Sequence, residues 1–371
     1  MRKISIFLLV LIICSGCSCQ RASDPRYLLS KGVSLYEKAE NSWKGAARDQ
    51  MMEESENILK QAVEKSPGDE ASCLALARVL LARGKILEAE KFYRKVYEIN
   101  PGSALACLGL GGILQNLQKR DEAESWYERA LKIDPRMVDA YCGLGDLAFD
   151  TMQYERAVGF YRQALLIDPK AENALSGLGD VYVDKGDLRQ AEECFRTMLK
   201  NEPSHSYALL GLGDVLEKSG RTGEAEKLYL EAYNDSPGDD EVLYNIAHFY
   251  LKRGLFDKAE EFLLKARAVN PEYEWSNGGM AVILIQRGKI EEAVKKLKQE
   301  IEKFPKNFEA HLLLARIYAS RGLDDEAKKQ VSMALGIGGD EARGILKQHP
   351  LPGRGEPVSS PPADRKKRRG R

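Results

Sequence analysis

The side chains that could carry out catalysis are few in this sequence. Its 371 residues include four histidines, which show no common spacing: His205, His248, His311 and His349. A general base needs a nucleophile or a second titratable group within hydrogen-bond reach, and a metal centre needs ligands at characteristic spacing. Between residues 70 and 339 we find no such spacing, no phosphate-binding loop and no nucleophile elbow. The sequence therefore predicts no enzyme activity, no cofactor and no metal.

The N-terminal residues have the composition of an export signal. Arg2 and Lys3 precede the apolar run of residues 4–13, and small residues follow this run. A charged start, a short apolar stretch and small residues are typical of a secretory signal. As a helix the run would rise about 15 Å, about half of the hydrocarbon core of a bilayer, so a stable transmembrane helix is the weaker interpretation.

Three of the seven cysteines lie in this N-terminal region. The stretch Cys14-Ser15-Gly16-Cys17 resembles the signal of bacterial lipoproteins, in which a cysteine becomes the lipid-modified N-terminus. The resemblance implies a signal peptide at residues 1–16, lipid attachment at Cys17 and a linker over residues 17–25. It implies export to the cell envelope, and Ser18 favours the periplasmic face of the outer membrane. Because Cys14 stands where the family usually has leucine, an ordinary signal peptidase site and an uncleaved anchor remain alternatives.

A proline recurs every 34 residues through most of the chain. The series is Pro67, Pro101, Pro135, Pro169, Pro203, Pro237, Pro271 and Pro305. Every unit also carries an alanine at one fixed position, a large apolar residue four places later and, earlier, an apolar residue followed by Gly or Ala. Such spacing predicts two amphipathic helices per unit. The proline ends the second helix because it pushes the preceding residue out of helical geometry.

The 34-residue period, with its leucine-glycine pair, alanine, aromatic residue and closing proline, resembles the tetratricopeptide repeat. The resemblance implies an all-α fold, a right-handed superhelical solenoid of about nine helical hairpins. We expect an irregular first repeat at residues 26–69, eight regular repeats at 70–339 and a short capping helix at 340–348. Residues 349–371 have no apolar period and end in a basic run, so we expect a disordered basic tail.

The cysteines inside the repeats invite a disulfide interpretation: Cys73, Cys107, Cys142 and Cys194. Cys73 and Cys107 occupy equivalent positions of adjacent units, so their backbones should lie about 8–10 Å apart, beyond the reach of an unstrained disulfide. We therefore interpret the four as small buried hydrophobic residues.

The resemblance also predicts a binding groove. In tetratricopeptide-repeat proteins the first helices of successive units line a concave face where ligands generally bind, and residues two, five, nine, twelve and thirteen of each unit share that side. The candidate groove residues at these positions are Asp146, Asp150, Asp180, Asp184, Tyr207, Asp214, Tyr244 and Trp275.

Two interpretations of these carboxylates remain open. An acidic groove beside aromatic residues would suit a partner segment that presents Lys or Arg with apolar side chains. Alternatively, Asp146, Asp180 and Asp214 are repeat-consensus polar residues that face water. Chaperone-tail-binding members of the family use Lys, Arg and Asn in this groove, so a terminal carboxylate is disfavoured as ligand.

The overall charge argues against nucleic acid as a partner, because Lys+Arg and Asp+Glu both number 56. We predict a non-enzymatic protein-protein interaction scaffold, lipid-anchored in the bacterial envelope, whose partner is a protein or peptide segment. The alternatives are a regulatory or adaptor subunit of a cell-wall or glycan enzyme and a cytoplasmic cochaperone-like adaptor. The basic tail could contact anionic lipid, remain solvated or fold back toward the groove.

Overall fold

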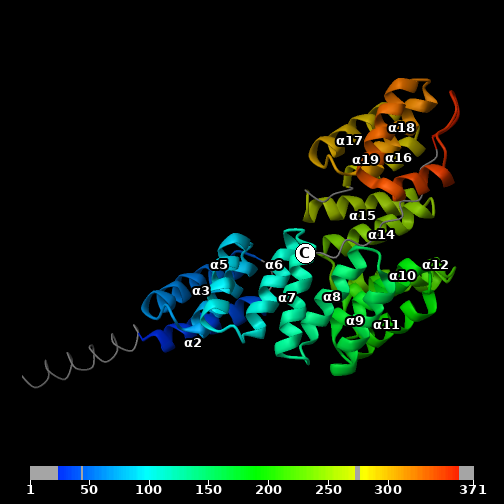
Figure 1. Cartoon of the computed structure of the whole chain (residues 1–371). Helices are drawn as coiled ribbons and strands as arrows, with labels where there is room; N and C mark the ends of the chain where they lie inside the picture. Colours follow the sequence, from blue (N-terminus) through cyan, green and yellow to red (C-terminus); the bar gives the residue numbers. More distant parts are fainter. Residues whose placement is uncertain (1–23, 43–44, 272–275, 359–371) are drawn as a thin grey trace, which may run out of the picture. The chain divides into compact units, whose positions relative to one another are not determined.

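The computed structural model describes residues 24–42, 45–271 and 276–358. These residues form eighteen helices and no strand. Figure 1 shows the helices coloured in chain order. The predicted all-α helical solenoid is therefore confirmed, whereas its handedness and its number of hairpins stay predictions. No described helix combines the length and the hydropathy that a membrane crossing needs. The chain divides into two compact units, Met1–Lys185 and Gly186–Arg371.

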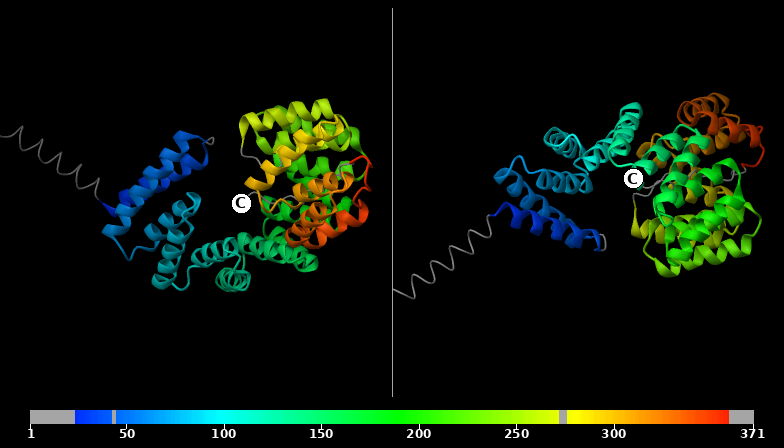
Figure 2. Two further views of the ribbon diagram at one scale, coloured as in Figure 1. Left: turned by 90° about the horizontal axis from the view of Figure 1, so that it is seen from above. Right: turned by 60° about the horizontal axis from the view of Figure 1, so that its bottom comes forward.

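The described part of the first unit consists of helices that pack as successive pairs. They are α2 (Pro25–Glu40), α3 (Ala46–Lys65), α4 (Glu70–Ala82), α5 (Ile86–Ile99), α6 (Ala104–Asn116), α7 (Arg120–Ile133), α8 (Val138–Asp150), α9 (Tyr154–Ile167) and α10 (Glu172–Lys185). Helices α2 with α3, α4 with α5, α6 with α7 and α8 with α9 form hairpins, which follow one another from blue to green in Figure 2. The first helices α2 and α4, α6 and α8, and α8 and α10 also contact each other.

The second unit continues the pattern. Its helices are α11 (Leu188–Asn201), α12 (Ser206–Lys218), α13 (Thr222–Asp235), α14 (Asp240–Lys252), α15 (Phe256–Val269), α16 (Ser276–Gln286), α17 (Ile290–Lys303), α18 (Phe308–Ser320) and α19 (Asp324–Gln348). Helices α12 with α13, α14 with α15, α16 with α17 and α18 with α19 form hairpins. The first helices α12, α14 and α16 also contact one another in order.

The prolines of the repeat stand just beyond the second helix of each hairpin. Helix α5 ends at Ile99 and α7 at Ile133, in each case two residues before the proline. The intervening residue has left helical geometry: Asn100 has φ −138° and ψ 93°. This is the steric effect of the proline ring on the residue before it.

The turn inside each hairpin needs a left-handed residue. Gly84, Gly186, Gly220, Gly254, Gly288 and Gly322 occupy this position with φ between 69° and 77°. Gln118 and Met152 stand at the same place in two other repeats with φ of 60° and 59°. Left-handed geometry brings the Cβ atom of an ordinary residue close to the following carbonyl oxygen, so these two turns are strained.

The hairpins approach closely because glycine faces an aromatic ring. The ring of Tyr127 on α7 lies between Gly111 of its own hairpin and Gly143 of the next hairpin. A Cβ atom at Gly111 would come within 2.7 Å of this ring, and one at Gly143 within 2.5 Å. The recurring small residue is therefore required by direct contact of the helix backbone with the ring.

The cysteines of the repeats are buried, as predicted: Cys73, Cys107, Cys142 and Cys194. Burial raises the pKa of the Cys73 and Cys107 thiols. A raised thiol pKa lowers the fraction of reactive thiolate, which agrees with a packing role.

A buried carboxylate joins the first two hairpins. Glu56 on α3 is 1% exposed and accepts hydrogen bonds from Lys60 and Lys85 at 2.7 Å each and from Arg83. Burial on its own would raise the pKa of Glu56, but these donors lower it to about 2. The carboxylate is therefore ionised at neutral pH and binds the hairpin turn that follows α4.

The C-terminal residues depart from the sequence prediction. Helix α19 kinks at Gly339 (φ 51°, ψ −123°), and Ala342 after the kink is buried against Leu312 of α18. We expected disorder from His349 onward, but residues 349–358 lie against α18: Arg316 donates to the His349 carbonyl, and the Gly355 amide donates to the Ser320 carbonyl. The expectation of disorder is wrong for residues 349–358. These residues lack an apolar period, but their backbone groups form hydrogen bonds with α18. Residues 359–371 lie outside the described part of the chain.

Candidate functional site

The predicted groove residues lie on the first helices of both units. Asp146 and Asp150 lie on α8, Asp180 and Asp184 on α10, Tyr207 and Asp214 on α12, and Tyr244 on α14. Helix α8 contacts α10 and helix α12 contacts α14, so within each unit these positions belong to neighbouring helices. We call the residues at positions two, five, nine, twelve and thirteen of each repeat the first-helix surface. Cys17 and Trp275 lie outside the described residues.

Two of the five predicted aspartates accept a hydrogen bond from the core of their own hairpin. The hydroxyl of Tyr161 donates to Asp146 Oδ1 at 2.5 Å, and the hydroxyl of Tyr229 donates to Asp214 Oδ1 at 2.5 Å. Both tyrosines come from the second helix and are buried, at 0% and 2% exposure. These contacts favour a structural role for the two carboxylates, which is the second of the interpretations above.

Asp180 occupies the same repeat position, but the residue fifteen places after it is different. Phe195 stands where the other two repeats have tyrosine, and phenylalanine has no hydroxyl to donate. Asp180 and Asp184 are half-buried on α10, whereas Asp150 at the end of α8 is exposed. The sequence could have predicted which aspartates accept a hydrogen bond from tyrosine, because Asp146 and Asp214 have a tyrosine fifteen places later and Asp180 has a phenylalanine.

Glu217 is a carboxyl group of this surface whose pKa is raised. Burial raises its pKa, the charge of Asp214 raises it further, and Lys252 partly opposes the shift. Glu217 is half-buried at position twelve of its repeat. The predicted set omits it, although its position in the repeat and its charge are both readable from the sequence. A desolvated carboxylate beside a second carboxylate gains most when a cation binds next to it.

The aromatic residues of the predicted set differ in accessibility. Tyr244 is only 2% exposed and stacks on His248, with ring centroids 6.2 Å apart and an interplanar angle of 15°. Tyr207 is half-buried and lies 6.3 Å from the ring of Phe195. The accessible aromatic surface is therefore smaller than the sequence suggested, and Tyr244 contributes mainly to packing.

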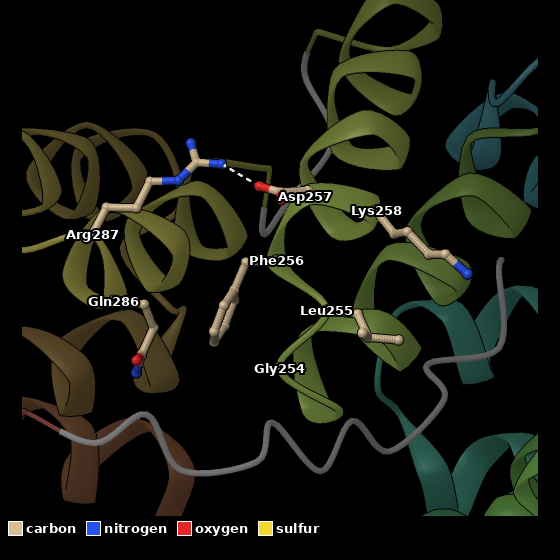
Figure 3. Close-up of a pocket in the computed structure, with 7 residues that line it drawn as sticks. All are labelled: Gly254, Leu255, Phe256, Asp257, Lys258, Gln286 and Arg287. Carbon is tan, nitrogen blue, oxygen red and sulfur yellow. Dashed lines mark hydrogen bonds and ion pairs between the residues drawn. The ribbon is translucent and has the colours of Figure 1, made fainter.

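A separate cavity of about 430 Å³ opens at the hairpin turns of the second unit. Its lining includes Phe256, Asp257, Gln286 and Arg287, which Figure 3 shows around the opening. Arg287 donates to Asp257 at 2.9 Å and to Glu260 at 2.7 Å. Charged groups at this cavity therefore pair across two hairpins.

Comparison with protein families matches most of the chain to helical-repeat models. Residues 102–348 match the family described as "Cilia and flagella-associated protein 70 C-terminal domain". Residues 52–104 match the family described as "Tetratricopeptide repeat". No curated protein sequence matches the chain.

Solved structures share the fold at low sequence identity. A tetratricopeptide repeat protein from Parabacteroides merdae superposes with a TM-score of 0.53 at 17% identity, over 69% of this chain and 99% of its own. PilW, described as a type IV pilus biogenesis factor, gives 0.51 at 19% identity, over 57% of this chain and 98% of its own. A monomeric IFIT1 mutant with a capped RNA gives 0.57 at 15% identity, over 84% of this chain and 71% of its own. These similarities concern the fold.

Proposed function

Because the chain belongs to the tetratricopeptide-repeat family, with residues 102–348 matching one of its repeat-domain models, we propose that it is a protein-interaction scaffold. Its first-helix surface binds a segment of a partner protein. The fold provides the reason: stacked hairpins repeat the same positions side by side and create an extended surface, whose specificity resides in the residues that vary between repeats. Absence of enzymatic activity stays a prediction.

One observation carries the proposed partner chemistry. The half-buried carboxyl group of Glu217 has a raised pKa beside Asp214. A Lys or Arg of the partner would offset both the desolvation and the like charge. Half-buried Tyr207 at position two of the same helix offers apolar surface. The second unit therefore favours a segment with a cationic side chain near an apolar one.

The test measures a defined basic probe on matched variants. A fluorescent peptide of alternating Lys and Leu is titrated into residues 23–371, and anisotropy gives the dissociation constant. Glu217→Gln should weaken binding by about fivefold to tenfold, because it removes one half-buried charge. Glu231→Gln, an exposed change on the second helix α13, is the control. Equal affinity of both variants would refute the acidic site.

The envelope location is part of the same proposal. Support comes from the sequence of residues 1–19, in which Cys17 is the attachment site of a lipid that holds the chain at the periplasmic face of the outer membrane. Cells grown with a clickable palmitate should label the chain, and Cys17→Ala should abolish the label. Cys19→Ala is the matched control, and unchanged labelling of Cys17→Ala would rule out this anchor.

The identity of the partner follows from affinity capture. With residues 23–371 as bait in an envelope extract, we expect subunits of an assembly, secretion or export machine. Recovery of a cell-wall or glycan enzyme would instead assign the chain as its regulatory or adaptor subunit.

A further inference from the structure

The segment that follows α19 lies on the first-helix surface of the last hairpin. Arg316 and Ser320 occupy positions nine and thirteen of α18, the positions of Asp214 and Lys218 on α12. Arg316 Nη1 donates to the carbonyl oxygens of His349 at 2.8 Å and Pro350 at 3.0 Å. The carbonyl of Ser320 accepts a 2.7 Å hydrogen bond from the Gly355 amide. The chain's own backbone is thus bound where a partner segment would lie.

The same segment ends at an apolar cluster that two hairpins share. Val358 packs against this cluster, whose buried members include Ile285 on α16 and Ile317 on α18, and Val282 on α16 packs against it as well. Val282 and Ile285 are positions nine and twelve of their repeat, so they also belong to the first-helix surface. Residues 349–358 therefore bind the first-helix surface of α18 and end at an apolar cluster to which the first helices of two successive hairpins contribute.

The segment of residues 349–358 contacts α18 mainly through its own backbone groups. Three prolines keep the segment extended at Pro350, Pro352 and Pro357, and a turn closes with the Glu356 amide donating to the Gly353 carbonyl at 3.0 Å. Gly355 has φ 83°, which places its amide toward Ser320. Val358 is the residue of the segment that packs against the apolar cluster formed by α16, α17 and α18. Recognition of this kind depends on an extended backbone and one aliphatic side chain.

The segment is bound at one end and exposed along much of its length. Arg316 is 4% exposed, and a buried guanidinium is costly unless acceptors surround it. In contrast, residues 353–357 are exposed, and Val358 is half-buried. Arg316 therefore holds one end of the segment, while the exposed residues bury little surface that would resist replacement.

We propose that residues 350–358 are a built-in competitor that closes the first-helix surface of α16 and α18 until an extended, proline-containing segment of a partner displaces them. The tether keeps the competitor at high effective concentration, so the partner must bind more tightly than the segment does. The inference rests on the proposed binding role of the first-helix surface, but on residues other than Asp214 and Glu217.

The test opens the site and supplies the segment in trans. The probe is a synthetic peptide of residues 349–358, and the readout is the methyl NMR signals of Val282 and Ile285, which detect even millimolar dissociation constants. Two forms of residues 23–371 open the site: a chain that ends at His349, and Gly355→Pro, which removes the amide bound to Ser320 and disallows φ 83°. Pro357→Ala, at an exposed residue, is the control.

We expect the peptide to shift both methyl signals in the truncated chain and in Gly355→Pro. The natural chain and Pro357→Ala should require at least tenfold more peptide, and a scrambled peptide should have no effect. Absence of shifts in the truncated chain, or equal titrations of the natural and truncated chains, would overturn the proposal. Neither result bears on the basic peptide and Glu217, so the two proposals fail separately.

Discussion

The hydroxyl of Tyr229, buried on α13, donates a 2.5 Å hydrogen bond to Asp214 Oδ1 on the first-helix surface of α12. This contact links the core of the hairpin to the surface that we propose binds a partner. Burial, and then the charge of Asp214, raise the pKa of Tyr229 well above its usual value. The tyrosine therefore remains a donor throughout the physiological range.

Tyr229→Phe should destabilise the second unit by about 1–3 kcal/mol, the usual effect of removing a hydrogen bond to a charged group. Urea unfolding measures the change in the free energy of unfolding. Tyr161→Phe removes the matching bond to Asp146 and should have an effect of similar size in the first unit. Two variants as stable as the natural chain would show that these bonds contribute nothing.

Gly143→Ala should destabilise the chain by about 1–3 kcal/mol, because its Cβ atom would lie 2.5 Å from the ring of Tyr127. Gly159→Ala is the same substitution on the neighbouring helix α9, where no heavy atom lies within 4 Å. The control should be stabilised by about 0.5–1 kcal/mol, since alanine is the better helix residue. Thermal unfolding measures both changes in stability. If Gly143→Ala and Gly159→Ala changed stability in the same direction, the close-packing argument would be wrong.

Met152→Gly should stabilise the hairpin of α8 and α9 by about 0.5–1 kcal/mol. Met152 has φ 59°, and its side chain is 65% exposed, so little packing is lost while backbone strain is relieved. Gly220→Ala introduces the opposite change at φ 77° and should destabilise by about 1 kcal/mol. Midpoints of denaturant unfolding measure both, and a loss of stability in Met152→Gly would refute the strain.

Glu56 should make stability depend on pH in the acid range. Its pKa falls from 4.5 in the unfolded chain to about 2 in the folded chain. The folded state holds this proton less tightly, so the stabilisation is complete above about pH 4.5 and is lost as the pH falls toward 2. Glu56→Gln should cost about 2 kcal/mol at pH 7, since the three cations remain partly solvated.

The control is Glu90→Gln at the same position of the next repeat, where the carboxylate pairs with Arg94 of its own helix. An exposed pair of this kind contributes less than about 0.5 kcal/mol. The two variants should therefore differ at pH 7 and converge near pH 2. If Glu56→Gln and Glu90→Gln lost the same amount of stability at pH 7, the cluster around Glu56 would not be cooperative.

Glu217→Gln should raise stability at pH 7, in contrast to its effect on partner binding. Because the folded chain raises the pKa of Glu217, it binds this proton more tightly than the unfolded chain does. The contribution of Glu217 to stability therefore decreases as the pH rises from the ordinary pKa of a glutamate through the raised pKa that Glu217 has in the folded chain. The extra stability of Glu217→Gln should vanish in acid. If Glu231→Gln gained the same stability at pH 7, desolvation of Glu217 could not be the cause.

Much of the fold could be predicted from the sequence because its determinants are local and periodic. The prolines fix where the second helices end, and glycine before the second helix fixes the turn, as at Gly220. The small residue that follows the recurring apolar residue is visible in the sequence, and at Gly111 it is the residue that the ring of Tyr127 contacts; the four repeat cysteines were interpreted as packing residues and are buried. In a solenoid these signals recur in every unit, so each one reinforces the others.

The candidate site could be predicted only as a set of positions. Helical spacing placed Asp146, Asp214 and Tyr244 on one side of the first helices, but it could not distinguish an available carboxylate from one bound to a tyrosine hydroxyl. It also could not show that Tyr244 is buried. Availability depends on side chains from the second helix and from the next repeat, which the pattern of a single helix does not contain.

The sequence by itself determined the repeat, its phase and the residue types on each helix face, because these follow from steric rules that act over a few neighbouring residues. The tertiary structure decided which of those residues remain accessible: Tyr229 engages Asp214, Glu217 is desolvated, and Arg316 binds the carbonyls after α19. The last of these contacts joins residues 33 places apart and lies in a segment without apolar periodicity. Its acceptor is a backbone carbonyl, a group that every residue has, so the residue types at the acceptor end do not predict the contact and only the folded chain reveals it.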